Sequence, residues 1–319
     1  KTESVMGNET RQPHAVLDLP SRSWKAEKIA RLLELASRKQ PIRLLEIGTG
    51  SGGIAHWFAH HPQLRCEVVA VDVCDNRQLH EGYSFQQVEG VDLPFEEASF
   101  DVVISNHVIE HVGDAQAQAR HLSEIRRVMK PDGVGYLAVP NRWMLTEPHY
   151  RLKFLSWWPH GWRTPYLKLM GKGDFYDCEP LEMRQLERML DATDFRHRNL
   201  CIDALRQTFE IERPHARVTL ALRRIPDILL KPLRSIIPTL IYRIARLTPL
   251  WLEIQAPVDL AATLREGALV QVAGLPARGR LIAIGRAVDA ASQSVLLRAA
   301  IDSGADRLRP GQTVEVELA

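Results

Sequence analysis

The spacing of apolar residues predicts alternating strands and helices over much of the chain. Short apolar runs indicate buried strands, and apolar residues three or four positions apart indicate helices. The predicted strands are 42–47, 67–71, 100–105, 135–139, 196–202 and 217–222, and the predicted helices are 24–37, 54–60, 116–129 and 180–190. Strands that alternate with helices form a sheet covered on both faces. The sequence therefore predicts an α/β fold with a doubly wound, mostly parallel sheet.

A period of two marks the last part of the chain. Apolar residues alternate along 295–301 and again along 314–318, as they do in half-buried strands. The strand-like runs are 251–254, 268–272, 280–284, 294–301 and 313–318. We therefore predict a second, small all-β domain over 249–319.

Three other stretches interrupt these patterns. Residues 1–20 are polar, and we expect a flexible N-terminus. Residues 140–178 hold nine Trp, Tyr and Phe residues, which predicts an aromatic-rich insertion. Residues 223–248 are apolar and basic, with six Arg or Lys against one acid, Asp227. This last pattern predicts a helical segment that either lies on an anionic membrane surface or covers the sheet with a solvated basic face.

Composition narrows the class of protein only slightly. The chain has 319 residues and a formal net charge of +2, so no nucleic acid partner is expected. Its four cysteines include no C-x-x-C pair, which is typical of reduced thiols in a cytoplasmic protein. No uncharged apolar run approaches the ~20 residues of a membrane span. We expect a cytoplasmic protein, with the inner membrane face as its one membrane contact.

A glycine-rich turn follows the first predicted strand, in the sequence LLEIGTGSGG at 44–53. Glycines accept positive φ and lack a Cβ, so a ligand can lie against the backbone. Gly48, Gly50 and Gly53 fit the dinucleotide pattern G-x-G-x-x-G, and Asp72 follows about 20 residues later, as a ribose-binding acid would. Glu46 adds a second pattern, E-x-G-x-G-x-G. The glycine pattern alone does not distinguish between two classes of protein. One is a nicotinamide-dependent oxidoreductase, and the other is a nucleoside-binding enzyme of another class.

The stretch 85–112, FQQVEGVDLPFEEASFDVVISNHVIEHV, resembles the methyltransferase-11 type of class I S-adenosylmethionine (SAM) methyltransferases. The resemblance covers about residues 20–248 and implies a Rossmann-like sheet of seven strands with a substrate lid at 140–178. It implies SAM as cofactor. The implied cofactor-binding residues are Glu46, Gly48, Thr49, Gly50, Gly52, Asp72, Val73, Glu89, Gly90 and Asn106. Glu89 stands where family members usually carry the Asp that accepts a hydrogen bond from the adenine amine.

The last 70 or so residues resemble a different family. The segments VDAASQSVLLRAAID and RLRPGQTVEVEL are similar to the β-barrel domain of periplasmic adaptor (membrane-fusion) proteins. This resemblance implies a protein partner for the C-terminal domain. A binding or assembly protein built on a degenerate Rossmann-like scaffold is the alternative to an enzyme.

Candidate catalytic residues lie near the predicted ligand edge of the sheet or in the lid. Methyl transfer to a hydroxyl needs a base, and histidine suits this role because its pKa lies near neutrality. The candidates are His107, His111 and His149. His107, Glu110 and His111 share one helical face, but we expect no metal there. The predicted acceptor is a small molecule or a lipid-linked molecule with a hydroxyl oxygen.

Overall fold

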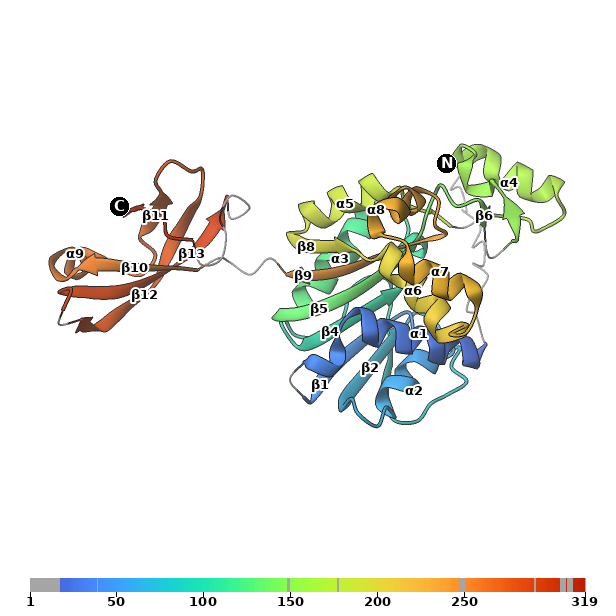
Figure 1. Cartoon of the computed structure of the whole chain (residues 1–319), viewed down its shortest axis with the longest axis horizontal. Helices are drawn as coiled ribbons and strands as arrows, with labels where there is room; N and C mark the ends of the chain where they lie inside the picture. The colour runs from blue at the N-terminus through green and yellow to red at the C-terminus, as the bar shows by residue number, and fades with distance from the viewer. Residues whose placement is uncertain are drawn as a thin grey trace, which may run out of the picture. The chain divides into compact units, whose positions relative to one another are not determined.

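Seven strands form the central sheet of the N-terminal part (Figure 1). The computed structural model describes residues 18–38, 40–147, 150–176, 178–246, 251–289, 291–304, 308 and 312–318. The strands are β1 Ile42–Ile47, β2 Cys66–Asp72, β3 Ser84–Gln87, β4 Phe100–Asn106, β5 Met129–Pro140, β8 Phe195–Asn199 and β9 Thr239–Arg246. Their order is β3-β2-β1-β4-β5-β9-β8. The first five are parallel, and β9 is antiparallel to both of its neighbours.

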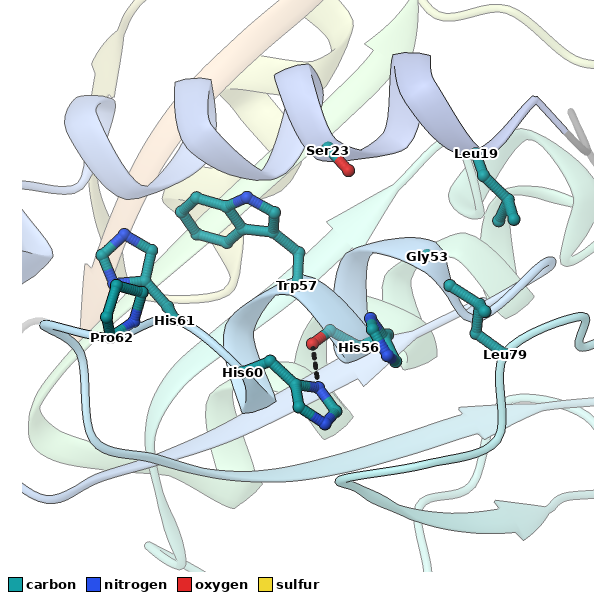
Figure 2. Close-up of a pocket in the computed structure, with 9 residues that line it drawn as sticks. All are labelled: Leu19, Ser23, Gly53, His56, Trp57, His60, His61, Pro62 and Leu79. Atoms are coloured by element: carbon teal, nitrogen blue, oxygen red, sulfur yellow. Dashed lines mark hydrogen bonds between the residues drawn. The ribbon is translucent and has the colours of Figure 1, made fainter.

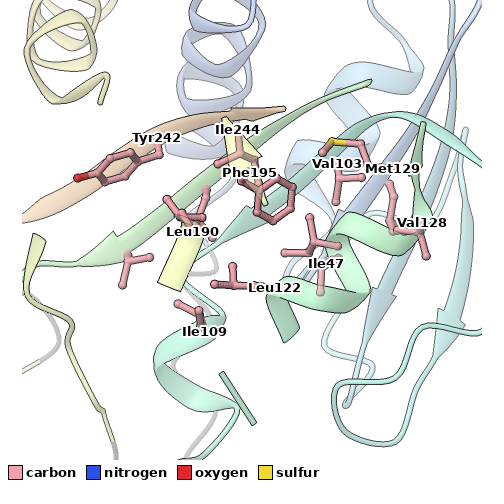
Figure 3. Packing of buried hydrophobic residues seen from close by; sticks show 14 of the residues in the cluster. Ile47, Val103, Ile109, Leu122, Val128, Met129, Leu190, Phe195, Tyr242 and Ile244 are labelled. Atoms are coloured by element: carbon pink, nitrogen blue, oxygen red, sulfur yellow. The ribbon is translucent and has the colours of Figure 1, made fainter. Parts of the chain in front are cut away.

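Helices cover both faces of this sheet. Side chains on both faces of β1, β2 and β4 are therefore buried. These helices are α1 Leu19–Leu32, α2 Gly53–Ala59, α3 Ala115–Val128, α5 Met183–Ala192 and α6 Cys201–Glu212. On one face, α3 and α5 pack on Leu45 and Ile244 in the cluster that Figure 3 shows in part. On the other face, α1, α2 and α6 pack on Leu44 and Tyr136. The predicted doubly wound α/β fold with seven strands is confirmed.

The aromatic-rich segment after β5 forms small elements of its own. These are β6 Thr146–Glu147, β7 Leu152–Lys153, the 3-10 helix η3 Leu155–Trp157 and α4 His160–Leu169. A separate small core holds them together, and it consists of Leu152, Leu155, Leu167, Tyr176 and Cys178. We call residues 141–182 the insertion.

The structure corrects two predictions between 217 and 248. The predicted strand at 217–222 is wrong, because these residues belong to α7 Arg217–Arg224. The predicted helical segment at 223–248 is wrong in its last part: after α8 Asp227–Leu230 and the 3-10 helix η4 Lys231–Ser235, the chain enters β9. In 217–222 the apolar Val218 and Leu220 are exposed and Thr219 is buried, so the alternation there marks no buried strand face. In β9 both faces are buried, so the strand shows no alternation.

Smaller differences concern where elements begin and end. Helix α1 begins at Leu19, inside the stretch expected to be flexible, and residues 1–17 lie outside the described part of the chain. The strand predicted to end at 202 ends at Asn199, and Cys201 begins α6. The Lys-Pro-Asp-Gly sequence at 130–133 lies in an irregularity of β5, between the residues paired with Phe100 and Val102.

The chain forms two compact units, residues 1–247 and 248–319. The second unit is a five-stranded antiparallel sheet in the order β10-β13-β12-β11-β14. Its elements are β10 Trp251–Pro257, α9 Val258–Thr263, β11 Leu269–Val272, β12 Arg278–Asp289, β13 Ser294–Ser303 and β14 Val316–Leu318. Its core includes Leu252, Ile254, Leu297 and Ala299. The predicted small all-β domain is confirmed.

Among the described residues, the helices are too short or too polar to cross a lipid bilayer.

The position of β9 gives a stability test. Ile244 is buried opposite Gly135 of β5 and His197 of β8. We expect Ile244→Ala to lower the free energy of unfolding of the N-terminal unit by about 2–5 kcal/mol, because the cavity cannot close fully. The matched change Leu229→Ala, at a side chain that is 67% exposed, should alter it by no more than about 0.5 kcal/mol. Urea denaturation followed by tryptophan fluorescence measures both. Equal stability of the two variants would contradict a buried β9.

Candidate cofactor and catalytic site

The turn between β1 and α2 is built on three glycines. Gly48, Gly50 and Gly52 all have positive φ, at 74°, 54° and 78°. A Cβ on Gly48 would lie 2.4 Å from Cγ2 of Val108, and one on Gly52 would meet the hydroxyl of Tyr83 at 2.3 Å. Both the backbone conformation and the close neighbours therefore require glycine.

The buried side chain of Glu46 holds this turn in place through hydrogen bonds. It is 2% exposed, and its Oε2 accepts hydrogen bonds from Oγ1 of Thr49 at 2.8 Å and from the N–H of Ala55 at 3.0 Å. Burial raises the pKa of Glu46 to about 8, although these two hydrogen bonds oppose the shift. The side chain is therefore largely protonated at neutral pH, and it ties β1 to the turn and to the first turn of α2.

Asp72, the last residue of β2, faces the glycine turn. Its Oδ2 accepts a hydrogen bond from the N–H of Gly50 at 2.9 Å, and its Oδ1 lies 3.4 Å from the amide nitrogen of Cys74. The carboxylate is only half-buried, so it keeps lone pairs for a further donor. Val73, the next residue, is exposed.

The remaining predicted cofactor residues follow β3 and end β4. Glu89 and Gly90 are exposed after β3, and the space beside Gly90, where a Cβ would point, is open within 4 Å. Asn106 ends β4, and its Oδ1 is buried without a hydrogen-bond partner. Buried amide oxygens are normally satisfied, so this atom is an acceptor available to a ligand.

These groups fit a nucleoside sulfonium. The strands that carry them are neighbours in the sheet, and their carboxyl ends share one edge, where open α/β sheets bind ligands. That edge offers the glycine turn at 48–52, a carboxylate at Asp72, open space at Gly90 and an unpaired acceptor at Asn106. These groups have the polarity that a ribose, an adenine and an amino-acid tail need.

His107 lies at the same edge in a strained backbone conformation. Its φ is 59°, uncommon for a residue other than glycine, and its N–H donates to the carbonyl of Ala138 at 2.9 Å. Its Nδ1 lies 3.1 Å from Oε1 of Glu110, which is 1% exposed. The Nε2 of His111 is 4.0 Å from the same oxygen. The structure thus brings two of the three predicted histidines together around one buried carboxylate. His149 lies outside the described residues.

A pocket of about 560 Å³ opens beside this group. It lies between 110–118 and the insertion with the start of α5, so segments far apart in the sequence build it. Glu110 and His111 belong to its wall, and Arg142, Arg163 and Tyr176 belong to the opposite side. Oε2 of Glu110 and the hydroxyl of Tyr176 are both buried without a partner. Sequence reasoning missed the three insertion residues, because only the tertiary contact brings them to the site.

Two further titratable side chains lie near the site, and no motif in the sequence points to either of them. His121 of α3 is buried, with its Nε2 3.0 Å from Oγ of Ser105, and burial lowers its pKa to about 4, so it stays neutral. Burial, followed by the charges of Arg22 and Lys28, lowers the pKa of Lys25 in α1 to about 7, while Glu110 raises it. Lys25 therefore lies within electrostatic reach of Glu110.

A second, smaller pocket lies between α1 and α2 (Figure 2). It has a volume of about 270 Å³, and α1, α2 and the loop at Leu79 line it. The rings of His56 and His60 stack at 4.1 Å, and Nδ1 of His60 lies 2.9 Å from the carbonyl oxygen of His56. None of the residues predicted for the site lines this pocket. Within the described residues, no group of three or more His, Cys, Asp or Glu could hold a metal ion.

Comparison with known proteins identifies the family. The profile of the methyltransferase domain family matches residues 21–199. This is more than half of the chain, so the chain belongs to that family. A second profile, for the CusB-like β-barrel domain, matches residues 249–319. Both resemblances found in the sequence are confirmed, and the family is not the nicotinamide-dependent one that the glycine spacing alone allowed.

Curated relatives match only a part of their length. The probable S-adenosylmethionine-dependent methyltransferase Rv3030 of Mycobacterium tuberculosis is 34% identical over 113 residues, which are 34% of this chain and 39% of that protein. The uncharacterized methyltransferase YcgJ of Bacillus subtilis is 28% identical over 120 residues, 34% of this chain and 45% of that protein. The chain therefore spans less than half the length of these relatives.

Among the solved structures that match this chain, two are matched over most of their own length. YcgJ of Bacillus subtilis has a TM-score of 0.41 at 17% identity, with 69% of this chain and 98% of that chain covered. A putative methyltransferase from Haloferax volcanii, solved with the Trm112 activator, has a TM-score of 0.43 at 16% identity, with 71% and 91% covered.

The buried carboxyl of Glu46 predicts a specific pH dependence of stability. Because its pKa rises from the usual 4.5 to about 8, the folded protein keeps a proton that the unfolded chain releases. This stabilisation is complete below about pH 4.5 and is lost as the pH rises through about 8. Glu46→Gln keeps an oxygen for Thr49 and Ala55 but cannot titrate. We expect the melting temperature of the wild type, relative to Glu46→Gln, to fall across this range in differential scanning calorimetry. Parallel curves for the two proteins would contradict a buried, protonated Glu46.

Proposed function

We propose that residues 21–246 transfer a methyl group from SAM to a hydroxyl oxygen of a small-molecule or lipid-linked acceptor. The observation that carries this proposal is the juxtaposition, at one sheet edge, of the glycine turn, the Asp72 carboxylate and the His107–Glu110 pair. Family membership supplies the reaction class. When bound, SAM would supply a methyl group on a sulfonium, and the C–S bond would break with the neutral thioether as leaving group, so the protein mainly aligns the acceptor.

The proposed cofactor contacts follow the geometry. The main chain and Thr49 of the 48–52 turn hold the amino-acid tail, and Asp72 accepts from the ribose hydroxyls. Val73, Glu89 and Gly90 line the adenine, and Oδ1 of Asn106 accepts from a ligand donor. Glu46 acts here as the buried support of the turn, since its Oε2 already accepts two hydrogen bonds inside the protein.

His107 is the proposed base. An Nδ1–H that donates to Glu110 leaves Nε2 with a free lone pair, and that atom takes the proton of the acceptor hydroxyl as its oxygen bonds to carbon. Glu110, buried beside it, stabilises the imidazolium that forms. His111 is the second candidate, because it borders the pocket and approaches the same oxygen of Glu110. His149 stays a prediction outside the described residues.

The 560 Å³ pocket is the proposed acceptor site. Its volume lies in the range of small-molecule sites, and Glu110 and His111 connect it to the sheet edge. The insertion forms its outer wall and would act as the lid. A hydroxyl presented from this pocket would reach the edge of the sheet beside the glycine turn.

Two partners complete the proposal. Peripheral contact with the inner membrane face through 223–248 is confined to its first part, where Ile228, Leu229 and Ile236 are exposed beside Lys231 and Arg234. The C-terminal unit has its own core and sheet, which supports a separate role for it in binding a protein partner.

Cofactor binding has a direct test in Asp72→Asn. The amide oxygen can still accept from Gly50, but the side chain loses the charge that a ribose diol favours. We expect SAM affinity in isothermal titration to fall about tenfold or more. Asp75→Asn, three residues away in the exposed loop after β2, serves as matched control and should bind as the wild type does. Failure of the wild type to bind SAM would overturn the function, and equal affinity of Asp72→Asn would overturn the role of Asp72 alone.

The His107→Ala variant tests the proposed role of His107 as the base. We expect His107→Ala to lower the turnover number by about 10²–10⁴-fold, to leave SAM affinity nearly unchanged, and to lose the acidic limb of the pH–rate profile. The assay follows labelled methyl from SAM into a fractionated extract of lipids and small metabolites. His197→Ala, on edge strand β8 and paired with Asp191, is the control histidine. A wild-type rate and pH profile in His107→Ala would remove this residue from the mechanism.

A further inference from the structure

The insertion exposes many more large apolar side chains than its small core uses. Trp162 is 65% exposed and Leu169 is 83% exposed, both on α4. The other exposed members are Trp143, Leu145, Phe154, Trp157, Trp158, Met170 and Phe175. We call these nine side chains the insertion surface. Exposed apolar side chains gathered on one element mark an interaction site rather than a scatter of single residues.

Ring contacts join five of these nine side chains into two groups. Trp157 packs edge-on against Trp143 at 5.5 Å and against Phe154 at 5.1 Å, and Trp158 stacks on Trp162 at 6.4 Å. The Nε1–H of Trp157 donates to the carbonyl of Met144 at 2.8 Å, which holds that ring in place. These five rings are therefore held in contact with one another before any partner binds.

The exposed charges around the insertion surface are mostly positive. Over 150–176 the exposed basic residues are Arg151, Lys153, Lys168 and Lys172, against one exposed acid, Asp174. Three of the four cations are lysines, which are depleted in protein–protein interfaces. Tryptophans together with lysines are instead typical of elements at a membrane–water interface, where the rings enter the headgroup region and long lysine side chains reach the anionic headgroups.

We infer that the insertion surface docks on an anionic lipid bilayer. The rings and Leu169 enter the interface, and Arg151, Lys153, Lys168 and Lys172 bind the lipid phosphates. This contact differs in place from the one at 228–236, since it uses α4, η3 and the turns beside them. It requires no methyl transfer, so it stands or fails independently of the proposed function.

One consequence does rest on the proposed function. Phe175 belongs to the insertion surface and also lines the 560 Å³ pocket, together with His160 at the start of α4. Docking would therefore place one wall of the acceptor pocket at the bilayer surface. An acceptor dissolved in the membrane could reach the pocket without crossing water, which selects the lipid-linked class of acceptor over a freely soluble one.

Vesicle flotation of the full chain tests the inference. We expect binding to vesicles of phosphatidylcholine with phosphatidylglycerol, and at least about tenfold weaker binding to phosphatidylcholine alone, because binding to anionic lipid adds electrostatic attraction to apolar burial. The double variant Trp162→Ala/Leu169→Ser should bind the anionic vesicles about tenfold more weakly than the wild type. Trp251→Ala, another exposed tryptophan but in the C-terminal unit, is the matched control and should bind as the wild type does.

Other outcomes would overturn the inference. The inference fails if the double variant binds anionic vesicles as strongly as the wild type does. It also fails if the wild type does not float with anionic vesicles, or if binding is lost only in Ile228→Ser/Leu229→Ser. A wild type that self-associates in sedimentation velocity but does not float, and a double variant that is monomeric, would assign the surface to a second copy of the chain. SAM titration of the double variant checks its fold. If the wild type floats with anionic vesicles but does not bind SAM, the proposed function is wrong, and the inferred membrane contact of the insertion surface still holds.

Discussion

The site depends on one buried carboxyl group. Glu46 receives hydrogen bonds from Thr49 and Ala55, so a single side chain fixes the end of β1, the glycine turn and the start of α2. Three of the five turn residues are glycines with positive φ, so few side chains of the turn itself can hold it. The Thr49 hydroxyl binds Glu46, and the N–H groups of Gly48 and Thr49 donate to the carbonyl of Val71. Protonation makes this burial tolerable, since a neutral carboxyl has a far smaller desolvation cost than a charged one. The N–H of Gly50 is thereby positioned for Asp72.

A second constraint acts where β4 ends. The positive φ of His107 turns the chain sharply, and the N–H bond to Ala138 on β5 and the Nδ1 contact with Glu110 hold that turn. Val108 then packs against Gly48, within a distance that leaves no room for a Cβ. The proposed base and the cofactor turn are thus mechanically coupled through one valine, so a larger residue at position 48 would disturb both.

The insertion connects the sheet edge with the surface. Its inner side supplies Arg163 and Tyr176 to the pocket, and Arg163 is held there by the carbonyl of Trp158 and by Glu179. Its outer side carries the exposed rings and lysines. A small core of five residues, Tyr176 among them, packs inside the insertion. Inner contacts and outer exposure therefore belong to one folded element.

The sequence alone determined whatever depends on neighbours along the chain. The strand–glycine–helix turn, the acid that ends β2 and the ligand edge at 106–111 follow from local spacing, because glycine conformation and strand ends are local properties. Only the tertiary structure decided that 239–246 is a strand between β5 and β8 while 217–224 is a helix. A strand buried on both faces and a helix with exposed apolar residues each lose their usual periodicity. The 560 Å³ pocket likewise came from contacts between 110–118 and 142–185, which no local pattern encodes.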